Sequence, residues 1–210
     1  MDAALLLSAL ATLLVTIDPP GLAPIFLSLT NGMDRNQRRQ VGLRATITGI
    51  IVLLVFVFFG AGLLGALGIS LDAFRIAGGL LLFAIAFEMI FEKRQERHET
   101  TVERAITQDD IRNIAAFPLA TPLIAGPGAI SATVLLSGQF EGAVGLTALC
   151  AILLACGGIL ALVFLLAERL DRFLGVTGRA LLTRLLGVLL AALSVQYVVD
   201  GVRGAVLSAA

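Results

Sequence analysis

The chain alternates between long apolar stretches and short polar ones, and four of the apolar stretches are uninterrupted. They cover residues 46–67, 73–91, 142–167 and 180–202. A helix rises about 1.5 Å per residue, so about 20 residues cross a hydrocarbon core of about 30 Å. Each of these stretches therefore predicts one transmembrane helix.

Two further apolar stretches, at residues 5–29 and 114–136, are interrupted by proline and glycine. The first contains Asp18-Pro19-Pro20-Gly21 and Pro24, and the second contains Pro118, Pro122 and Gly126-Pro127-Gly128. Proline breaks a helix, and lipid cannot satisfy the backbone groups that a break sets free. The pattern predicts two broken spans, which resume after their breaks as short helices at residues 22–30 and 129–137.

These segments together predict an all-α polytopic membrane protein of six transmembrane helices, of which helices 1 and 4 are broken. Placing Pro20-Gly21 on Pro127-Gly128 also brings span 2 over span 5 and span 3 over span 6. Each half has an odd number of spans, so we expect two inverted three-helix repeats. The predicted boundaries are 1–91 for the first repeat, 92–113 for a charged cytoplasmic linker and 114–210 for the second repeat, all within one membrane domain.

Composition and charge placement agree with a membrane protein. The chain is 58% hydrophobic and 14% charged, with a mean hydropathy of +0.98. Of its 15 basic residues, all except Arg75 and Arg203 fall on the side that follows spans 1, 3 and 5. The positive-inside rule then places both termini outside the cytoplasm. The zero net charge argues against nucleic acid binding, and the lipid bilayer is the expected environment.

The two breaks carry the chemistry that we expect to bind a substrate. A helix that starts inside the membrane presents unpaired N–H groups and a partial positive charge, which attract an anion such as a carboxylate. Beside proline, a glycine lets a ligand approach the backbone closely. The candidate substrate-binding residues are Asp18, Pro20, Gly21, Thr121, Gly126, Gly128 and Ser131. No cofactor, metal site or catalytic residue is predicted, and the single histidine, His98, lacks a ligand cluster.

Two kinds of charged residue leave alternatives open. Asp18 is the deepest acid, and its carboxylate could cap the following helix, bind a substrate ammonium group or carry a coupling proton. The second half has Ala125 in the matching place, so any charge chemistry is asymmetric. Arg75 and Arg184 occupy equivalent repeat positions, where they either anchor helix ends or form symmetric gates.

The residues around both breaks resemble those of a known family. The runs Thr16 to Pro24 and Phe117 to Ile130, together with Phe74 to Gly79 and Gln196 to Gly201, are similar to segments of the MarC family of bacterial inner-membrane proteins. The resemblance covers essentially the whole chain. It implies a six-span protein and, by likeness to some members, transport or export of small neutral amino acids such as alanine, glycine, serine and threonine.

The leading hypothesis is therefore a secondary transporter, and most naturally an exporter, of small neutral amino acids that works by alternating access. The alternative is a membrane-embedded enzyme acting on lipid-linked substrates, since some such enzymes also use inverted repeats. That alternative needs clustered catalytic groups at membrane depth, whereas the sequence offers one deep acid. We expect no enzymatic activity, and the sequence leaves a homo-oligomer open.

Overall fold

The protein is a bundle of helices, several of which are long enough to span a membrane. The computed structural model describes residues 2–31, 33–91, 115–140 and 142–209, and every regular element in them is helical. The elements are α1 (Ala3–Ile17), α2 (Pro19–Leu29), α3 (Arg35–Ala66), α4 (Leu71–Ile90), the π-helix η1 (Ala115–Ile124), α7 (Pro127–Ser137), α8 (Gly142–Leu165) and α9 (Ala167–Ala209). Five apolar segments in these residues can cross a membrane, and the bent pair formed by η1 and α7 makes a sixth. The chain is thus an all-helical membrane protein with five to six candidate spans.

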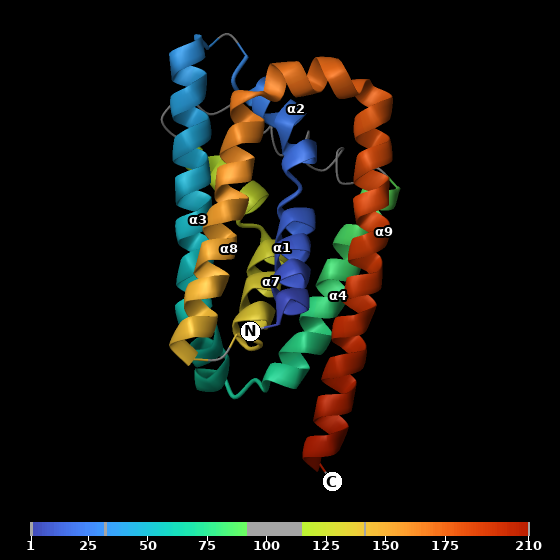
Figure 1. The fold of residues 1–210 in the computed structure, drawn as a ribbon. Coiled ribbons are helices and arrows are strands. Elements are labelled where there is room, and N and C mark those ends of the chain that lie inside the picture. The colour runs from blue at the N-terminus through green and yellow to red at the C-terminus, as the bar shows by residue number, and fades with distance from the viewer. Residues whose placement is uncertain (1, 32, 92–114, 141, 210) are drawn as a thin grey trace.

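The two broken segments run in opposite directions through the bundle. In Figure 1, α1 and α2 lead away from the end where both termini lie, whereas η1 and α7 lead back toward it. We call that end the terminal end. The opposite end, where α2 connects to α3 and α8 connects to α9, is called the basic end because it carries Arg35, Arg38, Arg39, Arg169 and Arg172.

The helices that follow the breaks begin earlier than the sequence predicted. We expected them at residues 22–30 and 129–137, but α2 starts at Pro19 and α7 starts at Pro127. Proline suits the first turn of a helix, because its fixed φ is helical and its missing N–H would have no partner there. The prolines therefore begin the new helices instead of lying in a loop before them.

Close approach of glycines brings the two halves of the chain together. A Cβ added at Gly79 of α4 would lie 2.8 Å from the carbonyl oxygen of Ser194 in α9. One added at Gly49 of α3 would lie 2.6 Å from a methyl carbon of Ile124 in η1. Such contacts are typical of membrane helices, which associate through small residues. The outward faces are apolar instead, with Phe59 69% exposed, as expected of a surface in lipid.

The last helix is bent near its start. Gly175 has φ 59° and ψ −175°, a conformation that side chains rarely adopt. The first part of α9 lies across the basic end, and the remainder, with a candidate span at Ala180–Leu207, runs back along α4 (Figure 1). The sequence predicted a span over 180–202 but no helix before it. The predicted linker at 92–113, with His98, lies outside the described residues.

Candidate functional site

The first break is a single residue, Asp18, between α1 and α2. Its φ of 56° and ψ of 61° are left-handed, a conformation that aspartate tolerates better than most residues. Its backbone N–H donates to the Leu14 carbonyl at 2.9 Å and so completes the last turn of α1. The residue is only 2% exposed, so this carboxyl group lies inside the bundle.

The start of α2 uses the Asp18 side chain as its cap. Pro19 and Pro20 have no N–H, the Gly21 N–H donates to the Asp18 carboxylate at 3.2 Å, and the Leu22 N–H donates to the Asp18 carbonyl at 3.0 Å. The negative charge also faces the positive end of the helix dipole. A Cβ at Gly21 would lie 2.2 Å from an oxygen of this carboxylate, so the cap requires glycine there. Of the three roles considered for Asp18, capping has its contacts in the structure; ammonium binding and proton transfer stay predictions.

The second break lacks an equivalent cap. The axes of Pro118–Ile124 and Pro127–Ser137 differ by 56°, and the extended residue Gly126 lies between them. Gly126 has no side chain with which to cap α7, so the N–H groups of Gly128 and Ala129 have no side-chain acceptor. Both residues are buried. This helix start is therefore an anion-attracting terminus whose own sequence supplies no anion.

The two breaks lie against each other. A Cβ added at Gly128 would lie 3.4 Å from the side-chain methyl of Thr16, which is two residues before Asp18, and 2.2 Å from Cδ1 of Ile85 in α4. Gly128 at the start of α7 thus lies beside the end of α1 and beside α4, and the shared site of the two breaks stays a prediction. Ile85 was missed, because an apolar residue within an apolar span gives no signal that it faces a break.

The hydroxyl of Ser131 differs from the other buried hydroxyls. In the described residues, every other buried serine or threonine donates to a carbonyl of its own helix: Thr12 to Ser8, Thr16 to Thr12, Thr30 to Phe26, Thr46 to Gly42, Thr133 to Ala129 and Ser194 to Ala191. Ser131 is 5% exposed and makes no such bond. The Ser131 hydroxyl, one turn after Gly128, is therefore not bonded within its own helix and could donate to a ligand.

The remaining predicted site residues are only half-buried or are exposed. Pro20 and Gly126 are half-buried, and Thr121 is exposed on η1, beside the cis bond to Pro122. Arg75 lies at the start of α4 and forms an ion pair with Asp72 at 2.9 Å.

Arg184, which is exposed, lies on α9 beyond the bend. The positions of Arg75 and Arg184 on different helices are compatible with either anchoring or gating, and both roles stay predictions.

A polar contact that the sequence did not single out lies on the terminal side of the breaks. The side chain of Tyr197 in α9 lies near those of Thr12 in α1 and Gln139. Tyr197 is the only tyrosine in the chain and is buried within a span. A lone tyrosine in an apolar helix was the available signal, since a buried phenol requires a polar partner.

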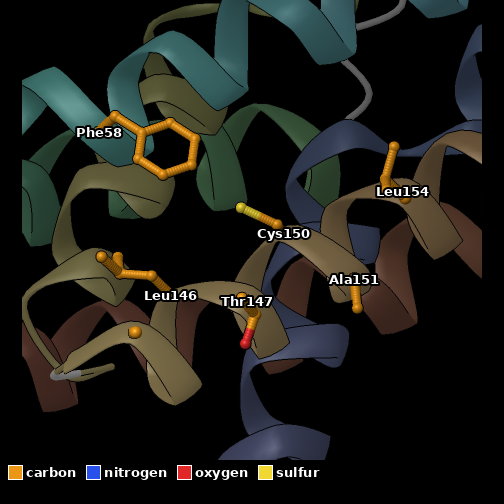
Figure 2. A pocket seen from close by; sticks show the side chains of 7 residues that line it. Phe58, Leu146, Thr147, Cys150, Ala151 and Leu154 are labelled. Carbon is orange, nitrogen blue, oxygen red and sulfur yellow. The ribbon is translucent and has the colours of Figure 1, made fainter.

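Two grooves on the outside of the bundle are not lined by residues of the breaks. One, of about 410 Å³, lies between α3 and α8 and is shown in Figure 2 with Phe58, Cys150 and Leu154 along it. Its one hydroxyl, on Thr147, already bonds to the Val144 carbonyl. The other, of about 390 Å³, lies between α1 and α8 and is equally apolar. Such surfaces suit lipid chains, and within the described residues no cluster of side chains could hold a metal ion.

The fold and the breaks define a multi-pass helical membrane protein in which two interrupted segments from different parts of the chain meet inside the bundle. Comparison with known families then identifies it further. The chain belongs to the MarC family of integral membrane proteins, whose model matches residues 3–206.

Similar proteins occur in bacteria and archaea. A UPF0056 membrane protein of Methanocaldococcus jannaschii is 37% identical, over 99% of this chain and 100% of its own. The UPF0056 membrane protein YhcE of Escherichia coli is 36% identical, over 91% of this chain and 89% of its own. One from Aquifex aeolicus is 37% identical, over 95% and 92%. The family thus extends beyond the bacterial proteins that the resemblance suggested, and no solved structure matches this chain.

Proposed function

We propose that this protein is a secondary transporter, acting as an exporter, that moves small neutral amino acids across a bacterial inner membrane by alternating access. The observation that carries the proposal is the meeting of the two breaks, where the uncapped start of α7 lies buried against Thr16. Broken helices inside a membrane are the usual place where transporters bind solutes.

The substrate carboxylate would bind at the start of α7. Its oxygens would accept from the N–H groups of Gly128 and Ala129, and the Ser131 hydroxyl would donate to it or to a substrate hydroxyl. At the start of α2, the Asp18 carboxylate accepts a hydrogen bond from the Gly21 N–H. At the start of α7, the substrate carboxylate would take this role. The substrate ammonium group would lie on backbone carbonyls freed by the breaks. This arrangement offers one site for a carboxylate per transporter. It also favours small substrates, because Ile85 and Thr16 approach Gly128 closely.

The packing of the helices supports the inverted repeat on which alternating access would depend. In each half, the short helix that follows the break packs against the two full-length helices of the other half: α2 contacts α8 and α9, and α7 contacts α3 and α4. The segment before each break follows the same rule, since α1 contacts α8 and η1 contacts α3. An exchange of this kind is what a twofold axis in the membrane plane would produce.

The proposed orientation follows from charge. The basic end carries the arginines of the α2–α3 and α8–α9 connections, and it would face the cytoplasm. The terminal end would then face the periplasm.

Transport by purified protein in liposomes tests this proposal. We expect exchange of labelled alanine or serine, and a panel of small amino acids, with and without a pH gradient, would identify substrate and coupling. Absence of flux for every small neutral amino acid would contradict the proposal.

A matched set of variants tests the position of the site. Gly128→Ala should lower flux by roughly 10- to 100-fold, because a methyl group beside the amide displaces the carboxylate. It would also meet Cδ1 of Ile85, which Ile85→Val removes. The double variant Gly128→Ala/Ile85→Val should therefore keep the lowered flux of Gly128→Ala, while Ile85→Val alone transports. Recovery of flux in the double variant would mean that Gly128 serves packing and not binding.

A further inference from the structure

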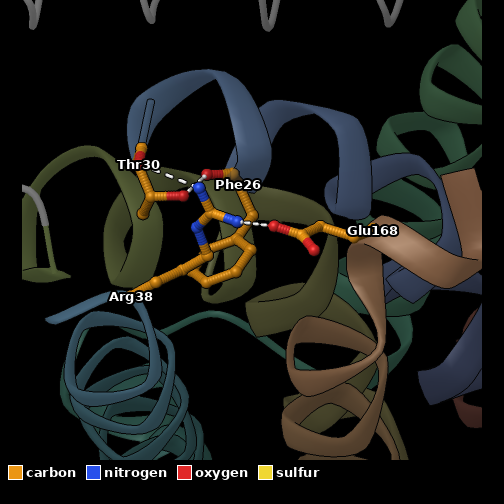
Figure 3. Close-up of polar contacts among 4 residues, drawn as sticks. All are labelled: Phe26, Thr30, Arg38 and Glu168. Carbon is orange, nitrogen blue, oxygen red and sulfur yellow. Dashed lines mark hydrogen bonds and ion pairs between the residues drawn. The ribbon is translucent and has the colours of Figure 1, made fainter. Parts of the chain in front are cut away.

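At the basic end, one ion pair joins the two halves of the chain. Arg38 of α3 contacts Glu168 at the start of α9 through Nη1, and its Nη2 donates to the carbonyl of Thr30 at the end of α2, at 3.5 Å (Figure 3). A single guanidinium therefore connects α2 and α3 of the first half to α9 of the second.

An aromatic contact lies one helical turn deeper at the same place. The rings of Phe26 in α2 and Phe164 in α8 are stacked, with centroids 4.4 Å apart and planes 18° apart, and both side chains are buried. Each is four residues before a member of the polar contact, since Phe26 precedes Thr30 and Phe164 precedes Glu168. Gly42 lies four residues beyond Arg38, where an added Cβ would be 3.2 Å from the Phe26 ring.

These two layers lie between the breaks and the basic end. Phe26 is five residues beyond Gly21, about 7.5 Å along α2 at about 1.5 Å per residue. Both layers join the first half to the second, so relative motion of the halves must separate them. In this structure both are closed.

We propose that the aromatic layer (Phe26, Phe164) and the polar layer (Thr30, Arg38, Glu168) form a gate that closes the basic end over the breaks. The proposal rests on the transport function proposed above. The components suit reversible opening. Glu168 is 62% exposed, and ion pairs of this kind are weak in water. Moreover, Nε of Arg38 is buried without an acceptor, so the closed arrangement leaves one donor unsatisfied.

Accessibility of a cysteine at the breaks tests the gate without a substrate. Ser131→Cys, in a background carrying Cys150→Ala and Cys156→Ala, reports the rate of modification by a membrane-impermeant thiol reagent added to either side of sealed vesicles. With the gate intact, modification from the basic side should be slow. Glu168→Gln combined with Phe164→Ala should raise that rate by roughly tenfold, since a closed state that loses one ion pair and one aromatic pair becomes less populated.

The control is a second ion pair, Arg75 with Asp72, at the start of α4. Asp72→Asn should leave modification from the basic side unchanged. An unchanged rate in the Glu168→Gln/Phe164→Ala variant, or an equal rise in Asp72→Asn, would overturn the gate. If Phe164→Ala prevents folding, Glu168→Gln by itself tests the gate. The exchanged pair Arg38→Glu/Glu168→Arg should restore slow modification.

The test separates the gate from the transport function. Faster modification without flux of any amino acid would support the gate and contradict the substrate class. Flux with an unchanged modification rate would support transport and reject the gate.

Discussion

Asp18→Asn distinguishes capping from charge chemistry at the first break. Asparagine caps helices about as well as aspartate and also tolerates the left-handed conformation, so the bond from the Gly21 N–H is kept. The loss of charge removes a favourable helix-dipole interaction of about 0.3 to 1 kcal/mol. It also removes the cost of a charge at membrane depth, about 2.5 to 3.5 kcal/mol. Stability should therefore rise by about 1.5 to 3 kcal/mol.

Asp18→Ala should behave differently, since it removes the cap and leaves a residue with a Cβ at φ 56°. Both variants lack the charge, so relative to Asp18→Asn the expected loss is about 1 kcal/mol for the cap and about 1 to 2 kcal/mol for the left-handed conformation. Thermal unfolding of the purified variants in detergent measures these differences, and flux in liposomes measures function. We expect Asp18→Asn to transport at close to the wild-type rate and Asp18→Ala to be less stable and slower than Asp18→Asn. Loss of flux in a stable Asp18→Asn protein would show that the charge binds an ammonium group or carries a proton.

Further predictions concern neighbouring positions with matched controls. Ser131→Ala should weaken substrate affinity by roughly 5- to 10-fold, the cost of one hydrogen bond, whereas Thr133→Ala should not, because that hydroxyl bonds within α7; equal effects in flux titrations would refute the assignment. Gly79→Ala should destabilise by about 1 to 3 kcal/mol, because its Cβ would meet the Ser194 backbone, while Gly62→Ala, whose Cβ would meet nothing within 4 Å, should be neutral or stabilising. Thermal unfolding of the pair in detergent checks this, and similar stability in both would contradict the packing described.

The breaks could be predicted from the sequence because prolines and glycines that cluster inside an apolar segment interrupt the hydrogen bonding of a helix. Asp18 was recognisable as a cap candidate because it directly precedes two prolines and a glycine. The start of α2 was placed too late because proline in an apolar run suggests an interruption, whereas Pro19 and Pro20 occupy the first helical turn.

Other features depend on contacts between distant parts of the chain. The approach of Ile85 to Gly128 depends on how α4 and α7 pack. The helix across the basic end depends on one left-handed glycine, Gly175, within a polar stretch that looked like a connection. Thr121 was expected to flank the site on the basis of its sequence position, but the course of η1 leaves it exposed.

The most direct measurement of the central claim follows backbone amides during substrate binding. Protein labelled with ¹⁵N-glycine in lipid nanodiscs should show the Gly128 resonance shifting when alanine is added, but not when alaninamide, which lacks the carboxylate, is added. The Gly21 amide, already bonded to Asp18, should not move. A shift at Gly21 in place of Gly128, or no shift at Gly128 at alanine concentrations that saturate flux, would contradict a carboxylate site at the start of α7.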